Sequence, residues 1–177
     1  MFATLAFVCF SIQANPTPTP LQLSDKRFQY STDQNTKNSS ERWLLVQKGN
    51  KTLQRIPLTG PAAEQPSSEI ILKDINFDGQ ADLVITSNRG NVNSMHQYWL
   101  YDSQSKIFTF NPVLSNDLAG YELTVDSTKK LLTAAARFSC CEHEWKTYRF
   151  VGKQLKLVEK KTVKGNAKGE RTKVTRY

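Results

Sequence analysis

One stretch of the sequence places oxygen-bearing side chains at a spacing that suits a hard metal ion. It reads DINFDGQAD, which is the pattern D-x-N-x-D-G-x-x-D. Oxygens at loop positions 1, 3 and 5, from Asp74, Asn76 and Asp78, converge on one point when the chain coils tightly, and glycine at position 6 permits the sharp turn. Gln80 at position 7 would offer its backbone carbonyl, and Asp82 at position 9 would close the shell directly or through water. We expect these five residues to bind a metal ion.

Ca²⁺ is the expected ion because it takes an all-oxygen shell, whereas Mg²⁺ demands stricter octahedral geometry. An EF-hand would have a bidentate Glu at position 12, where this chain has Ile85. The flanking segments 70–72 and 83–85 are short and largely β-branched, so we expect an EF-like calcium loop between two strands. Its expected role is structural, since the ion would neutralise three carboxylates. A metal-free turn stays open as the alternative, because Asp-Gly turns are common between strands.

The other chemistry-bearing residues do not form a catalytic pattern. His96 and His143 are the two histidines, so acid–base catalysis has few possible centres. Cys140, Cys141 and His143 lack a fourth ligand at zinc-site spacing. Glu142 and Glu144 would lie on the same solvent-exposed face of a strand rather than act as a glycosidase pair. With no phosphate loop, dinucleotide fingerprint or nucleophile elbow, we expect a protein that is not an enzyme.

The N-terminus indicates export. Residues 1–14, MFATLAFVCFSIQA, carry no charge and contain a short apolar run that ends at Ala14. A bilayer span needs about 20 apolar residues, so the segment predicts a signal peptide rather than a membrane anchor, although the usual basic start is missing. A buried N-terminal strand is the alternative. Export would make the protein periplasmic or secreted. The adjacent Cys140 and Cys141 could then remain thiols, form a vicinal disulfide or pair between chains.

Positive charge is concentrated at the C-terminal end. The formal net charge is +8, and residues 153–177 hold nine Lys and Arg against two Glu. No aromatic residues are interleaved with this basic run, so a solvated tail is expected rather than a nucleic-acid site. We therefore divide the chain into a signal peptide at 1–14, a Pro/Thr- and Ser/Asn-rich linker at 15–40, an all-β domain at 41–160 and a basic tail at 161–177.

Short apolar runs separated by turn residues indicate the fold class. Their spacing approaches the 8–12 residues per strand that is typical of all-β sandwiches, barrels and propellers. Residues 118–121 and 131–136 would also suit a helical turn, but we predict strands there. The predicted strands lie within 43–46, 69–72, 83–85, 98–101, 107–110, 121–125, 131–136, 145–151 and 155–158.

Two resemblances extend this interpretation. The loop followed by Leu83-Val84-Ile85 resembles the calcium loop of integrin-type FG-GAP repeats, which are blades of β-propellers. The longer pattern, from the loop through YWLYD at 98–102 to YRF at 148–150 and GKQL at 152–155, resembles a family of small bacterial periplasmic proteins. That resemblance implies a propeller-like arrangement of short antiparallel strands with an EF-like calcium loop.

The same resemblance implies a function. Characterised members are immunity proteins that inhibit lysozyme-like peptidoglycan hydrolase effectors of antibacterial type IV secretion systems, many by occluding the hydrolase cleft. We expect a protein partner of this kind, with Tyr121 and Tyr148 as candidate partner-binding residues. The alternative is an extracellular FG-GAP-like adhesion or carbohydrate-binding module, in which Trp99 and Trp145 would contact a glycan. Oligomeric state stays open.

Overall fold

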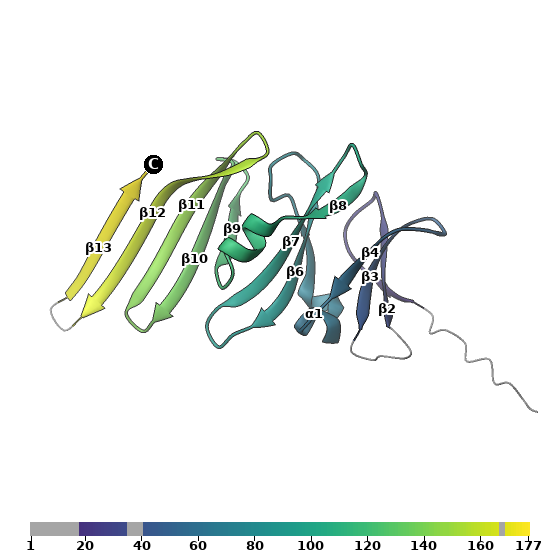
Figure 1. The fold of residues 1–177 in the computed structure, drawn as a ribbon, viewed down its shortest axis with the longest axis horizontal. Coiled ribbons are helices and arrows are strands. Elements are labelled where there is room, and N and C mark those ends of the chain that lie inside the picture. Colours follow the sequence, from purple (N-terminus) through teal and green to yellow (C-terminus); the bar gives the residue numbers. More distant parts are fainter. Residues whose placement is uncertain (1–17, 35–40, 167–168) are drawn as a thin grey trace, which may run out of the picture.

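The structure, a computed structural model, describes residues 18–34, 41–166 and 169–177. The predicted signal peptide at 1–14 lies outside these residues. Within the described ranges the chain forms thirteen strands in three antiparallel sheets with few helical turns, which confirms the all-β prediction. Figure 1 shows the second sheet lying between the first and the third. The strand pairings leave three separate sheets, so the propeller-like arrangement stays a prediction.

The first sheet is a four-stranded meander whose first two strands lie in the segment expected to be a linker. Tyr30 and Thr32 of the second strand are buried, so the described part of this segment, residues 18–34, joins the core instead of only connecting to it. The sequence conceals this strand because QYSTDQ alternates only weakly between apolar and polar residues. The strands are β1 (Thr19–Leu21), β2 (Gln29–Gln34), β3 (Arg42–Lys48) and β4 (Lys51–Leu58).

The second sheet is also a meander, and short helical turns flank it. Residues 118–120, where we predicted a strand, form a turn after the helical element η1. The strands are β5 (Ile70–Lys73), β6 (Asp82–Arg89), β7 (Ser94–Asp102) and β8 (Ile107–Phe110). The helical turns are α1 (Pro61–Glu64), α2 (Pro66–Glu69) and the π-helical η1 (Val113–Asp117).

The third sheet has five strands and takes in the segment expected to be a tail. The last strand pairs residue by residue with its neighbour, from Glu159 opposite Arg176 to Asn166 opposite Gly169. Its Lys and Arg residues alternate with Thr and Val, a pattern that suits an exposed edge strand because charge there opposes edge-to-edge aggregation. The strands are β9 (Glu122–Asp126), β10 (Leu131–Ser139), β11 (Glu142–Val151), β12 (Gln154–Asn166) and β13 (Gly169–Arg176).

Two apolar clusters lie on opposite faces of the second sheet. Because successive side chains of a strand point to opposite faces, Leu83 and Ile85 of β6 pack toward the first sheet while Val84 packs toward the third. Leu132 and Ala134 of β10 complete the second cluster at the same period of two. The run 83–85 is apolar throughout because its strand is covered on both faces.

Each sheet carries one of the three tryptophans: Trp43 in β3, Trp99 in β7 and Trp145 in β11. In the first and third sheets a cation lies over the indole: Arg55 is 5.3 Å from the Trp43 ring centroid and Lys161 is 5.2 Å from that of Trp145. Trp99 instead packs edge-on against Phe110, with ring centroids 5.3 Å apart. All three indoles are partly buried.

Candidate metal loop and adjoining pocket

The predicted calcium loop connects β5 to β6, between two strands as expected. Phe77 and Gly79 have positive φ angles of 63° and 82°, which coil the chain tightly. Gly79 takes this conformation without steric cost because it has no Cβ. Phe77 reaches it with its ring packed against the second apolar cluster. The coil is thus fixed by one glycine and by one aromatic side chain anchored in the core.

Three of the predicted ligands lie on this coil and bind its backbone. Asp74 accepts hydrogen bonds from the backbone N–H groups of Asp78 (3.2 Å) and Gly79 (3.0 Å). Asn76 accepts one from Asp78 N–H (3.1 Å), and its amide donates to the Asp78 carboxylate (2.9 Å). Asp78 in turn accepts from Gln80 N–H (2.8 Å). The structure therefore brings the oxygens of loop positions 1, 3 and 5 onto one turn.

Asp82 differs from these residues because its side chain points into the protein. It is fully buried, and its two oxygens accept hydrogen bonds from the backbone N–H groups of Ile75 and Tyr101, each at 2.8 Å. Burial raises the pKa of the Asp82 carboxyl to about 6; the negative charges of Asp78 and Asp74 add to this, and the two N–H donors oppose it. Asp82 therefore ties the loop to β7.

Gln80 is held by a residue far away in the sequence. Arg27 donates to the Gln80 side-chain carbonyl (3.0 Å) and to the backbone carbonyl of Ala81 (2.7 Å). Asp25 orients Arg27 through a 3.0 Å ion pair, and the guanidinium lies 4.2 Å from the Tyr101 ring centroid. We call Asp25 and Arg27 the latch. No motif in the sequence indicates the latch, because both residues lie in the segment taken for a linker.

The loop fits a cation in part. Its oxygen donors are of the kind that Ca²⁺ prefers, and Asp74, Asn76 and Asp78 lie on one turn. Among the described residues, however, no group of three or more His, Cys, Asp or Glu side chains is gathered as a metal site. Both oxygens of Asp82 already accept backbone hydrogen bonds. The residues that would hold a cation are therefore Asp74, Asn76, Asp78 and the Gln80 carbonyl, with Asp82 behind them.

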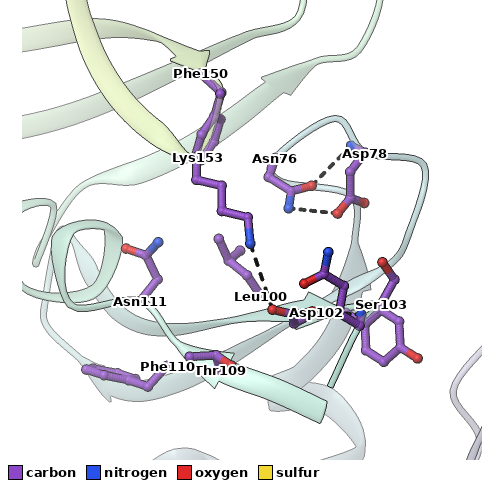
Figure 2. A pocket seen from close by; sticks show the side chains of 13 residues that line it. Asn76, Asp78, Leu100, Asp102, Ser103, Thr109, Phe110, Asn111, Phe150 and Lys153 are labelled. Atoms are coloured by element: carbon purple, nitrogen blue, oxygen red, sulfur yellow. Dashed lines mark hydrogen bonds and ion pairs between the residues drawn. The ribbon is translucent and has the colours of Figure 1, made fainter. Parts of the chain in front are cut away.

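A pocket of about 440 Å³ opens beside this loop (Figure 2). Asn76 and Asp78 line one side, and the turn between β11 and β12 lies across from them. Lys153 on that turn reaches over the pocket, with its Nζ 3.9 Å from the Asp102 carboxylate. The lining combines amides and carboxylates with the rings of Phe110 and Phe150. No sequence pattern predicts this pocket, because its walls come from four separate segments.

Tyr121, one of the two candidate partner-binding residues, is mostly buried. Its hydroxyl donates to Glu144 (2.8 Å), and Lys146 lies 4.4 Å from its ring centroid. Burial alone would raise the pKa of Glu144, but hydrogen bonds from Lys160 and Tyr121 outweigh it and hold that pKa below its ordinary value. Glu144 is buried, so the expectation that it lies on a solvent-exposed face is wrong.

Tyr148, the other candidate, is half-buried and packs against the same apolar cluster as Tyr121. The structure thus brings the two tyrosines to one cluster between the second and third sheets. Trp99 and Trp145, the residues proposed to contact a glycan, lie on different sheets. No helix in the described part of the chain has the length and apolar character needed to cross a membrane.

Comparisons with known proteins give one informative result. The chain matches no known family and no curated protein. A solved structure described as that of a Xanthomonas type IV secretion system related protein has a similar fold, with a TM-score of 0.63 over 91% of this chain and 95% of that chain. The two sequences are 20% identical, so the likeness is one of fold.

Proposed function

We propose that this protein is an exported, non-enzymatic inhibitor that protects against a lysozyme-like peptidoglycan hydrolase by occluding its cleft. The observation that carries the proposal is the shared fold, along nearly the whole chain, with a type IV secretion system related protein. The sequence resemblance to periplasmic immunity proteins points the same way. In this proposal the three sheets form a propeller-like scaffold and the protein acts in the periplasm.

The proposed contact surface surrounds Phe138, which has 58% of its surface exposed next to the turn between β10 and β11. Tyr121 supports it edge-on, with ring centroids 6.2 Å apart. An exposed aromatic ring braced by a buried one is the kind of anchor that dominates protein interfaces. Tyr121 and Tyr148 would then contribute mainly by shaping this surface.

The test is inhibition of a lysozyme-like hydrolase acting on purified peptidoglycan. We expect the protein to bind and inhibit it, and Phe138→Ser to weaken binding at least about tenfold. Ile71→Ser is the matched control, because Ile71 is 51% exposed on β5, away from this turn. Absence of inhibition by the unaltered protein would contradict the proposal. An equal loss of binding in Phe138→Ser and Ile71→Ser would contradict the assignment of the contact surface to Phe138.

We also propose that the loop from Asp74 to Asp82 binds Ca²⁺ and that the ion stabilises the fold. An ion that binds only the folded state adds about 2.7 kcal/mol when present at a hundredfold excess over its dissociation constant. We expect a higher thermal midpoint in Ca²⁺ than in EDTA, and no such difference in Asp74→Ala/Asp78→Ala. Asp126→Ala, at the end of β9 and outside the loop, should keep the full difference. Equal thermal midpoints in Ca²⁺ and EDTA would show that the loop is a turn that binds no Ca²⁺.

The pocket favours a second candidate, a carbohydrate-binding module. Side-chain amides and carboxylates that line a cavity beside phenylalanine rings suit a sugar, whose hydroxyls need hydrogen-bonding partners and whose ring faces are apolar. Binding of soluble peptidoglycan glycan fragments, lost in Asn111→Ala and without inhibition of any hydrolase, would favour this function. Hydrolase inhibition that is unchanged in Asn111→Ala would favour the first.

A further inference from the structure

Cys140 and Cys141 occupy the two-residue turn that joins β10 to β11. Both side chains are exposed free thiols, and their sulfur atoms lie 2.8 Å apart. From the sequence alone, these thiols could stay free, pair with each other or pair between chains. The contact between the two sulfurs favours pairing within the chain, because each thiol already lies against the other.

The turn is fixed on both sides of the pair. Cys141 N–H donates to the Ser139 hydroxyl (3.2 Å), and the Cys141 carbonyl accepts from Gly165 N–H of β12 (2.7 Å). A β-bulge between Arg137 and Ser139 adjusts the strand before the turn. Neither cysteine is among the described non-glycine residues with positive φ. The thiols are therefore held together on an ordinary, anchored backbone.

A metal site does not account for the arrangement. His143, the nearest histidine in sequence, stacks on Trp145 with ring centroids 5.9 Å apart. No third ligand of the His, Cys, Asp or Glu type gathers with the two sulfurs in the described ranges. Two adjacent thiols without further ligands suit chemistry that uses both sulfurs at once, namely disulfide exchange.

We propose that Cys140 and Cys141 are a reversible modification site at which a disulfide-containing oxidant converts the two thiols into one disulfide within the chain. One cysteine thiolate attacks the oxidant, breaks its S–S bond and releases one oxidant thiolate. The second cysteine loses its proton and attacks the protein sulfur of the mixed disulfide, which releases the other oxidant thiolate. The cysteines lose two electrons, and the oxidant becomes two thiols that take up both protons.

The product should be easy to reopen. Adjacent residues have Cα atoms about 3.8 Å apart, below the about 4.4–6.8 Å that is usual for disulfides. A bond formed under that restraint is of the labile class rather than the structural class. We therefore expect reduced glutathione to restore both thiols without unfolding the protein. This inference does not depend on the proposed hydrolase partner.

The test uses the full chain carrying Cys9→Ser, so that Cys140 and Cys141 are its only thiols. After treatment with oxidised glutathione, intact mass and thiol alkylation should show loss of both thiols and no retained glutathione. Cys140→Ser and Cys141→Ser, each made in that background, should keep the glutathione adduct because no second thiol resolves it. Adducts that persist on the intact pair, or disulfide-linked dimers, would overturn the proposal.

A second measurement separates the effect of the fold from mere adjacency. The rate of disulfide closure is compared between folded protein and the same protein in urea. If the turn holds the sulfurs together, closure should be at least about tenfold faster in the folded state. An equal or slower rate in the folded protein would show that the turn does not favour the bond, and would overturn the assignment.

Discussion

The two interfaces that flank the second sheet are built differently. Between the first and second sheets, buried side chains such as Leu44 and Leu83 belong to one apolar cluster. Polar bonds cross this interface as well: Gln54 binds both the N–H and the carbonyl of Phe108, at 2.8 and 2.7 Å. The latch at Arg27 adds a further crossing to the loop. This interface is closed by apolar packing and by hydrogen bonds together.

The interface between the second and third sheets contains a wedge. Leu114 and Leu118, in and just after η1, fill the space between the sheets. Ser115 fixes the wedge by accepting a hydrogen bond from Tyr98 N–H of β7 (2.9 Å). The pocket of Figure 2 lies between parts of the same two sheets. Hydrogen bonds cross this interface too, since Asn93 binds both the N–H and the carbonyl of Arg137, at 3.3 and 2.9 Å. The wedge and the pocket distinguish the second interface from the first, and the pocket leaves room for a ligand or partner.

The largest expected effect tests this difference in packing. Leu44→Ala should cost about 4 kcal/mol of unfolding free energy, and Leu114→Ala about 3 kcal/mol. Both side chains are fully buried. Leu114 follows Asn111, which lines the pocket, so we expect the wedge to shift and to refill part of the cavity. Chemical denaturation of both variants checks this, and a larger loss for Leu114→Ala would reverse the comparison.

The latch should give the next largest effect. Asp25→Asn should lower the unfolding free energy by about 3 kcal/mol, because it leaves the partly buried Arg27 without its charged partner. Burial by itself would raise the pKa of Asp25, but hydrogen bonds from Arg27 and Tyr30 outweigh it and keep the pKa below 3.8. Denaturation near neutral pH measures the loss.

The pH dependence of the latch follows from the direction of that shift. The unfolded chain has the higher Asp25 pKa and takes up the proton first as the pH falls. The stabilisation is therefore complete well above pH 3.8 and is lost as the pH falls through the folded-state value. The difference between Asp25→Asn and the unaltered protein should shrink in acid. A difference that stays constant down to low pH would contradict the assignment.

A smaller effect is expected at the second interface from Tyr121→Phe. The variant removes one hydrogen bond to Glu144 and should cost about 1 kcal/mol. Glu144 keeps its ion pair with Lys160 at 2.8 Å. Burial and the bond to Glu144 raise the pKa of Tyr121 to about 12. Burial also raises the pKa of Tyr30, Tyr98 and Tyr148, so an ultraviolet titration of Tyr121→Phe should show one fewer late-titrating tyrosine than that of the unaltered protein.

The smallest effect is expected at the mouth of the pocket. Lys153→Ala removes an exposed side chain whose nitrogen lies 3.9 Å from Asp102. Exposed ion pairs contribute little to stability, so the denaturation midpoint should not move. If the pocket takes a ligand, glycan affinity should change in this variant while stability does not. A clear loss of stability would mean that the turn at Lys153 closes the interface.

Apolar runs located most of the sheet strands in advance. The run 83–85 lies within β6 and the run 131–136 within β10, because their side chains are buried and the pattern records burial. Four strands escaped prediction: β1, the polar β2, β4 and the basic β13. Tyr30 is the only large apolar residue in β2, and β13 is exposed along nearly all of its length. Pairing with neighbours creates both strands, and no local pattern records that pairing.

The candidate site was predictable to a similar degree. The spacing from Asp74 to Asp82 located a coiled loop between two strands, and the structure has one there. The same spacing gave no sign that Asp82 points inward, because the direction depends on the position of Tyr101 N–H in a neighbouring strand. The latch lies 53 residues from Gln80. Contacts across such distances become visible only in the folded chain.

The distribution of the tryptophans has a consequence for how folding can be observed. Trp43, Trp99 and Trp145 place one intrinsic fluorophore in each sheet. Variants that retain a single indole would therefore report the melting of each sheet separately by emission wavelength. Coincident transitions would show one cooperative unit. Earlier loss of the Trp145 signal would show that the third sheet detaches first, across the interface that holds the wedge and the pocket.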